Sequence, residues 1–83
     1  MKILYFAWLR EKIGQSEEYI DLPDNLKTVA DLLAWLETRG DAYKQALSEK
    51  GVVRVAINQE HVDLDHALDG AVEIALFPPV TGG

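Results

Sequence analysis

The 83-residue sequence contains no cysteine. This absence excludes disulfide bonds, a thiolate metal site and a cysteine nucleophile, and secreted chains of this length often need disulfides. Long hydrophobic runs are also missing, because the apolar opening ILYFAWL is only seven residues long and runs into Arg10, Glu11 and Lys12. It is too short for a membrane span and lacks the small-residue cleavage site of a signal peptide. We therefore expect a cytoplasmic protein with no membrane partner.

Basic residues are few, with 8 Lys and Arg against 14 Asp and Glu, and the formal net charge is -6 at pH 7. Such a chain is not attracted to phosphate backbones, so we do not expect a nucleic-acid partner. Hydrophobic residues make up 48% and charged residues 27%, which is typical of a globular protein. Without a repeat or a break in composition, the length predicts a single domain over residues 1–83.

Two segments near the start predict strands joined by a wide connection. KILYFAWLR (2–10) is rich in aromatic and β-branched residues and apolar on both faces, which favours a central strand. A polar turn or a single helical turn, closed by Gly14, is expected to follow. EEYIDL (17–22) then alternates, which places three residues on one side: Glu18, Ile20 and Leu22. The two segments predict a hairpin.

The segment TVADLLAWLETRG predicts the main helix, from Thr28 to Arg39. Thr28 can cap the helix, and Asp31 follows three residues later as in a capping box. Gly40 is predicted to end it. The apolar stripe at helical spacing consists of Val29, Leu32, Leu33 and Leu36, with Trp35 at its edge.

The second half of the chain predicts a short helix and three more strands. YKQALSEKG is the helix, VVRVAIN and AVEIALF are strands, and HVDLDHALDG is a short strand followed by turns. The residues expected to face inward are Val53, Val55, Ile57, Val72, Ile74 and Leu76. The order β, β, α, β, β, β with minor helical turns predicts an α+β domain, in which one main helix packs on one face of a mixed sheet.

A partner surface is predicted on the other face of this sheet. If Ile3, Tyr5, Ala7 and Leu9 face the helix, the alternate residues face away: Lys2, Leu4, Phe6, Trp8 and Arg10. Phe77 has the outward parity in the last strand. We therefore predict that Phe6, Trp8 and Phe77 form an exposed apolar patch that binds a partner, unless loops or the second helix cover it.

A metal site is the alternative interpretation of His61, Asp63, Asp65 and His66, which lie close together in the sequence. The segment lacks the glycine and the bidentate glutamate of a calcium loop, and the chain has no third histidine for a zinc site. We predict a solvated turn here and no bound metal.

The order of elements and the ending FPPVTGG resemble the ubiquitin-like β-grasp fold. Within that fold the chain is similar to the small, sulfur-carrying subunit family of molybdopterin synthase. The segments that carry the resemblance are FAWLREKIG, VAINQEHVDLDHAL and DGAVEIALFPPVTGG, so it covers nearly the whole chain. The family usually has an acidic residue where this chain has Ala71. A bare Gly-Gly ending would also suit a thiamin-pathway sulfur carrier or a ubiquitin-like protein modifier.

The resemblance implies chemistry on the main chain of Gly83. A carboxylate is a poor acyl donor, and joining it to AMP supplies a good leaving group. An E1-like adenylating enzyme would use ATP to adenylate Gly83, and sulfur from a persulfide donor would replace AMP to give a thiocarboxylate. The tail would then insert into the large subunit, which holds the catalytic residues of a heterotetramer. There it would give sulfur to a cyclic pyranopterin precursor in molybdenum cofactor biosynthesis. No permanently bound cofactor is implied.

Residues 78–83 are expected to form an extended, flexible tail. Pro78 and Pro79 stiffen its base, and the inserted part continues through Val80, Thr81 and Gly82 to Gly83. The glycines lack Cβ and therefore fit a narrow channel. Six extended residues reach at most about 20 Å, which is enough to enter a partner's active site. A plain β-grasp interaction module, by contrast, would need no free Gly83.

Overall fold

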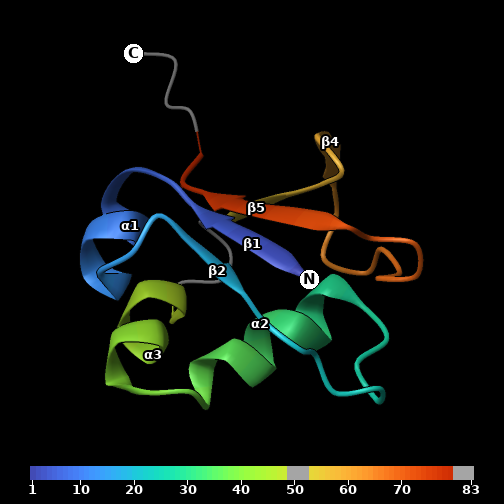
Figure 1. Cartoon of the computed structure of the whole chain (residues 1–83). Coiled ribbons are helices and arrows are strands. Elements are labelled where there is room, and N and C mark those ends of the chain that lie inside the picture. Colours follow the sequence, from blue (N-terminus) through green and yellow to red (C-terminus); the bar gives the residue numbers. More distant parts are fainter. Residues whose placement is uncertain (49–52, 80–83) are drawn as a thin grey trace.

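The computed structural model describes residues 1–48 and 53–79. The elements follow in the order β1 (Lys2–Tyr5), α1 (Ala7–Ile13), β2 (Glu17–Tyr19), α2 (Val29–Glu37), α3 (Asp41–Leu47), β3 (Arg54–Ile57), β4 (Glu60–Val62) and β5 (Glu73–Phe77). The five strands form one sheet in the order β2-β1-β5-β3-β4. β1 and β5 are parallel and the other pairs antiparallel, so the predicted mixed sheet is confirmed. The helices lie on one side of it (Figure 1).

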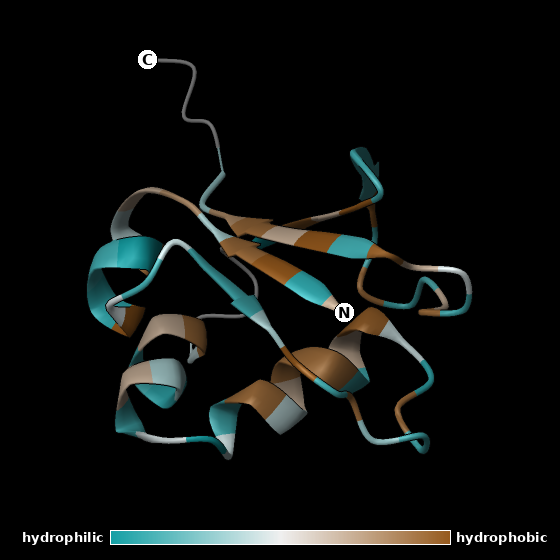
Figure 2. Ribbon diagram, in the orientation of Figure 1, coloured by the Kyte–Doolittle hydropathy of each residue, from teal (hydrophilic) through white to brown (hydrophobic). Residues whose placement is uncertain are grey.

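The core lies between the sheet and α2. Side chains alternate in burial along β1 and β5, where Ile3, Tyr5, Ile74 and Leu76 are buried as predicted. Hydrophobic residues are concentrated on these two strands and on α2 (Figure 2). The predicted inward position of Val72 is wrong, because its side chain is 72% exposed. Val72 precedes the first residue of β5, so the alternation of the strand does not extend to it.

The main helix begins as predicted and ends earlier. Thr28 and Asp31 form a reciprocal capping box, and the whole predicted stripe of Val29, Leu32, Leu33 and Leu36 is buried. The helix ends at Glu37, and Thr38 at its C-terminal cap donates its side-chain hydroxyl to the Trp35 carbonyl at 2.6 Å. Gly40, predicted to end this helix, instead precedes α3 with a φ of 156°. The predicted second helix is confirmed over Tyr43–Leu47. It begins two residues earlier than predicted, at Asp41, and predicted residues 49–51 lie outside the described part of the chain.

The predicted first strand is too long, because the chain becomes helical at Ala7. Leu9 is buried on this helix, and Trp8 and Ile13 pack against the core beside it. Gly14 closes the helix in the left-handed conformation, with its N–H donated to the Arg10 carbonyl at 2.8 Å. A short apolar run fits a strand and a buried helix equally well, which explains the error.

No helix in residues 1–48 and 53–79 has both the length and the apolar character that crossing a membrane requires.

Candidate functional site

The base of the predicted tail is held at the centre of the sheet. β5 lies between β1 and β3, and Pro78 and Pro79 follow its last residue and are half-buried. The Phe6 N–H also donates to the Leu76 carbonyl at 3.1 Å. The point where the chain leaves the sheet is therefore fixed from both sides. The other predicted tail residues lie outside the described part of the chain: Val80, Thr81, Gly82 and Gly83.

An apolar surface borders this point on the sheet side that the helices leave uncovered. One row of it runs from Leu4 to Ala75 and Ala56, which are register partners on β1, β5 and β3. Ala56 is buried but does not belong to the core cluster, as expected for a side chain on the opposite face. Phe6 is 46% exposed and Phe77 is half-buried. We call this surface the outer face: Leu4, Phe6, Ala56, Ala75 and Phe77.

Trp8 does not belong to the outer face. Its predicted place beside Phe6 and Phe77 depended on a continuous strand through residue 10, which is wrong. Trp8 lies on α1, half-buried, and packs against the core. Ala7 causes the change of direction, because its φ of 54° is left-handed and unusual for a residue with a Cβ. The chain leaves the sheet there, directly after Phe6.

His61 joins the outer face from β4, which sequence reasoning missed. It is the register partner of Ala56, and its ring lies 5.1 Å from that of Phe77, centroid to centroid, at an angle of 55°. The two-residue turn of Asn58 and Gln59, both with positive φ, sets this register. Had a two-residue hairpin turn been predicted at Asn58 and Gln59, the pairing of His61 with Ala56 would have followed.

Asn58 also fixes the entry into β5. Its Oδ1 accepts the N–H groups of Val72 and Glu73 at 2.9 and 3.0 Å, and its Nδ2 donates to the Gly70 carbonyl at 3.1 Å. Its own N–H donates to the Glu73 carbonyl at 2.8 Å. One side chain thus ties the β3–β4 turn to the strand that carries the tail.

The predicted solvated turn is confirmed from Asp63 to His66, whereas His61 lies on β4. Residues 63–66 are exposed, and the His66 N–H donates to the Asp63 carbonyl at 3.1 Å. His61 and His66 line a surface hollow of about 630 Å³ together with Arg54, Glu60 and Asp63. Across residues 1–48 and 53–79, no group of three or more His, Cys, Asp or Glu side chains is placed to hold a metal ion.

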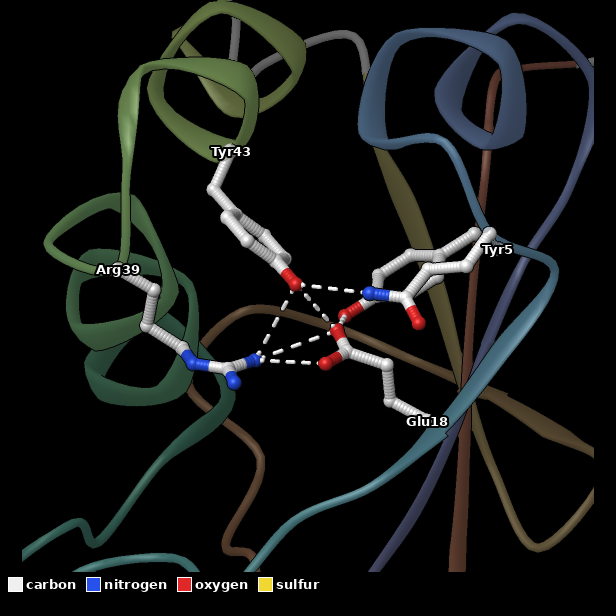
Figure 3. Close-up of polar contacts among 5 residues, drawn as sticks. Tyr5, Glu18, Arg39 and Tyr43 are labelled. Carbon is white, nitrogen blue, oxygen red and sulfur yellow. Dashed lines mark hydrogen bonds and ion pairs between the residues drawn. The ribbon is translucent and has the colours of Figure 1, made fainter.

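A polar network lies on the helix side of the sheet (Figure 3). The hydroxyls of Tyr5 and Tyr43 donate to Glu18 Oε1 at 2.7 and 2.6 Å, and Arg39 Nη1 lies 3.1 Å from Glu18 Oε2. The Arg39 guanidinium lies 5.0 Å from the Tyr43 ring centroid and 5.6 Å from that of Trp35. The network connects β1, β2 and α3, so its role is structural.

The network sets the ionisation of its members. Burial pushes the pKa of Glu18 upward, but the hydrogen bonds from Tyr43, Tyr5 and Arg39 together outweigh it and hold the pKa below its ordinary value. Burial raises the pKa of Tyr5, and its hydrogen bond to the Glu18 carboxylate raises it further. Glu18 is therefore a carboxylate and Tyr5 a neutral donor at neutral pH. The predicted placement of Glu18 on the same side as Ile20 and Leu22 was the available signal for this network, because a carboxylate among apolar side chains needs hydrogen-bond partners.

Curated relatives match the chain over its full length. It is 43% identical over 83 residues to the molybdopterin synthase sulfur carrier subunit of Haemophilus influenzae, covering 100% of this chain and 99% of the relative. The corresponding Escherichia coli subunit is 40% identical, with the same coverage. Small archaeal modifier protein 3 of Haloferax volcanii is 36% identical, and the match covers 100% of this chain and 98% of the relative.

Solved structures agree with the fold. SAMP1 from Haloferax volcanii superposes with a TM-score of 0.72 at 33% identity, covering 100% of this chain and 98% of that one. A protein–protein complex of subunits 1 and 2 of the molybdopterin-converting factor from Helicobacter pylori contains a chain with a TM-score of 0.58 at 27% identity, and the coverage is 99% and 96%. A sequence model of the ThiS family matches residues 3–83. The chain therefore belongs to the ThiS family and has its α+β, ubiquitin-like β-grasp fold.

Proposed function

We propose that this chain is the sulfur carrier subunit of a molybdopterin synthase and that it carries sulfur as a thiocarboxylate on Gly83. The observation that carries the proposal is the position of Pro78 and Pro79, which directly follow the central strand β5 beside the outer face. The full-length relatives that are sulfur carrier subunits support the same assignment. The chain is then a sulfur-donating subunit and not an enzyme on its own.

The proposed chemistry begins with an oxygen of the Gly83 carboxylate, which attacks the α-phosphorus of ATP on an E1-like adenylating enzyme and releases pyrophosphate. A persulfide sulfur then displaces AMP from the carbonyl carbon. A donor thiol cleaves the resulting sulfur–sulfur bond, becomes part of a disulfide, and leaves the thiocarboxylate. Both sulfur-bearing groups must come from a partner, because this chain has no cysteine. ATP is consumed by the activating enzyme and is not a resident cofactor.

The tail is proposed to comprise residues 78–83 of a single 1–83 domain. Pro78 and Pro79 stiffen its base, while Val80, Thr81, Gly82 and Gly83 enter the partner's active site. There the thiocarboxylate gives its sulfur to a cyclic pyranopterin precursor, with catalytic residues supplied by the large subunit. The expected setting is a cytoplasmic heterotetramer.

The outer face is the proposed docking surface for the large subunit. Phe6 and Phe77 flank the start of the tail, and exposed aromatic side chains are the usual anchors of protein interfaces. The Helicobacter pylori relative was solved as a complex of subunits 1 and 2, which supports a partner of this kind. Docking there would hold the tail within reach of an active site up to about 20 Å away.

A protein modifier is the second candidate function. It is favoured by the 36% identity to small archaeal modifier protein 3 and by the superposition on SAMP1, both from Haloferax volcanii. A modifier would form isopeptide bonds between Gly83 and lysines of other proteins, whereas a carrier would release its sulfur and regain a carboxylate. A thiamin-pathway carrier would share the activation step and differ in the acceptor enzyme.

Mass spectrometry tests the proposal. After incubation with the activating enzyme, ATP and a sulfur donor, the chain should gain the mass difference between sulfur and oxygen. Adding the large subunit and the pyranopterin precursor should reverse that gain and produce molybdopterin. Stable conjugates to other proteins, without molybdopterin, would favour the modifier instead.

A further inference from the structure

We propose that Pro78 and Pro79 act as a strand terminator. Each lacks the N–H that would extend β5 along one of its two neighbouring strands, and together they release the tail from the sheet at a fixed residue. The inference rests on the proposed function, because it concerns how the same tail is presented to the partner. It gives both prolines a positioning role that depends on a missing hydrogen-bond donor and goes beyond the stiffness of their rings.

The hydrogen bonds between β1 and β5 identify the first missing donor. The Phe6 N–H donates to the Leu76 carbonyl at 3.1 Å. In a parallel ladder, the carbonyl of the same residue accepts from the residue two positions further along the neighbouring strand. For Phe6 that residue is Pro78, which has no N–H to donate. The ladder between β1 and β5 therefore ends at Phe6.

The Phe6 carbonyl, where that bond would form, accepts from helix α1 instead. The Leu9 N–H donates to it at 3.2 Å, just after the chain turns at the left-handed Ala7. A carbonyl oxygen has two lone pairs, so this contact does not by itself exclude a second donor. The missing donor at Pro78 is therefore what stops the ladder.

The ladder between β3 and β5 meets the second proline. Asn58 donates its N–H to the Glu73 carbonyl at 2.8 Å, so the odd-numbered residues of β5 face β3. Phe77 is the last of them in the strand, opposite Arg54. The next residue to face β3 is Pro79. One proline would end only one ladder, whereas a central strand with a neighbour on each side needs two in succession.

The end of β5 sets the length of chain that can enter a partner. Pro78 and Pro79 are half-buried, so they still lie against the protein after the strand has ended. A residue with an N–H at position 78 could extend the ladder to Phe6. Each residue added to β5 in this way would shorten the reach of the tail by about 3.3 Å. The two prolines thus keep all six residues of the proposed tail, 78–83, available for insertion.

Two substitutions at one position separate the missing donor from the ring. Pro78→Ala restores the N–H, whereas Pro78→N-methylalanine, made by chemical synthesis, has neither the N–H nor the ring. NMR detects the expected hydrogen bond directly, as a scalar coupling between the nitrogen of residue 78 and the carbonyl carbon of Phe6. Pro23→Ala is the control for losing a proline elsewhere, since Pro23 lies in the loop before α2.

Pro78→Ala should show this coupling, and its new N–H should exchange slowly with solvent. Chains loaded with sulfur, with the loading shown by mass, are then compared in transfer to the pyranopterin precursor on the large subunit. The kcat/KM of Pro78→Ala should fall about fivefold, because one hydrogen bond of ordinary strength must break before the tail is released. Pro78→N-methylalanine should recover most of this loss, and Pro23→Ala should transfer at the wild-type rate.

Absence of the coupling in Pro78→Ala would overturn the strand terminator. Equally poor transfer by Pro78→Ala and Pro78→N-methylalanine would also overturn it, because that result assigns the effect to the ring. Unchanged transfer by Pro78→Ala in spite of the coupling would remove the positioning role. A wild-type chain that accepts no sulfur would overturn the proposed function instead, and the NMR coupling would still decide whether Pro78 ends the ladder.

Discussion

Glu18 and Arg39 form an ion pair, with 3.1 Å between Oε2 and Nη1, although they lie 21 residues apart. Glu18 is on β2 at the edge of the sheet, and Arg39 stands between α2 and α3. The pair, together with Tyr5 and Tyr43, connects the edge strand to the helices. The helix layer is thereby held on the side opposite the outer face.

Glu18→Gln should destabilise the fold at neutral pH, because the two tyrosines and Arg39 lose a charged acceptor. The folded pKa of Glu18 lies below its ordinary value of 4.5, so its contribution is present above pH 4.5 and is lost as the pH falls through the folded pKa. The stability gap between wild type and variant, measured by urea unfolding, should therefore narrow below pH 4.5. Glu17→Gln is the control, since its contact with Lys2 is 3.9 Å long and exposed. Identical urea curves for the two variants would contradict the network.

Leu33→Ala should lower the free energy of unfolding by about 2 to 5 kcal/mol, because Leu33 is fully buried between α2 and the sheet. The same change at Leu64, which is 37% exposed, should cost clearly less. Chemical denaturation of both variants measures the difference. Similar losses at the two positions would contradict the packing of α2.

Phe6→Asp combined with Phe77→Asp should abolish docking to the large subunit and leave the melting curve cooperative, because both side chains lie on the outer face. Val72→Asp also places a charge on an exposed apolar residue, but at the end of β5 away from the tail, and should dock normally. Surface plasmon resonance compares the three proteins. Retained docking by the double variant would remove the outer face as the docking surface.

The main helix could be predicted because its signals agree. Thr28 and Asp31 mark the start, and the apolar stripe from Val29 to Leu36 fits only a helical period. The end of the first strand could not be predicted, because the apolar run through Leu9 fits both a strand and a helix. Only the helix end at Gly14 and the packing of Leu9 in the core distinguish the two. The predicted inward position was right for Ile74 and wrong for Val72. The Val72 and Glu73 N–H groups donate to Asn58 Oδ1 where the chain enters β5, and the sequence pattern does not reveal these hydrogen bonds.

Part of the candidate site could be predicted, because residues alternate between the two faces of a strand. Phe6 and Phe77 follow from the parity of two central strands, and neighbouring strands bring them together. Trp8 was misplaced because a single left-handed residue, Ala7, takes the chain out of the sheet, and no residue type demands that conformation there. His61 depends on the hairpin register after Asn58, a long-range pairing that spacing alone does not reveal.

If Gly83 carries sulfur on its terminal carboxylate, a chain extended by one alanine after Gly83 should fail as a sulfur donor. The added residue leaves the outer face unchanged and moves the carboxylate to a different place. Molybdopterin formation should be measured in a reconstituted reaction with the large subunit, the activating enzyme, ATP, a sulfur donor and the pyranopterin precursor. We expect normal folding, normal docking and almost no molybdopterin. Molybdopterin formation at the wild-type rate, with the extra alanine shown by mass to be retained, would contradict it.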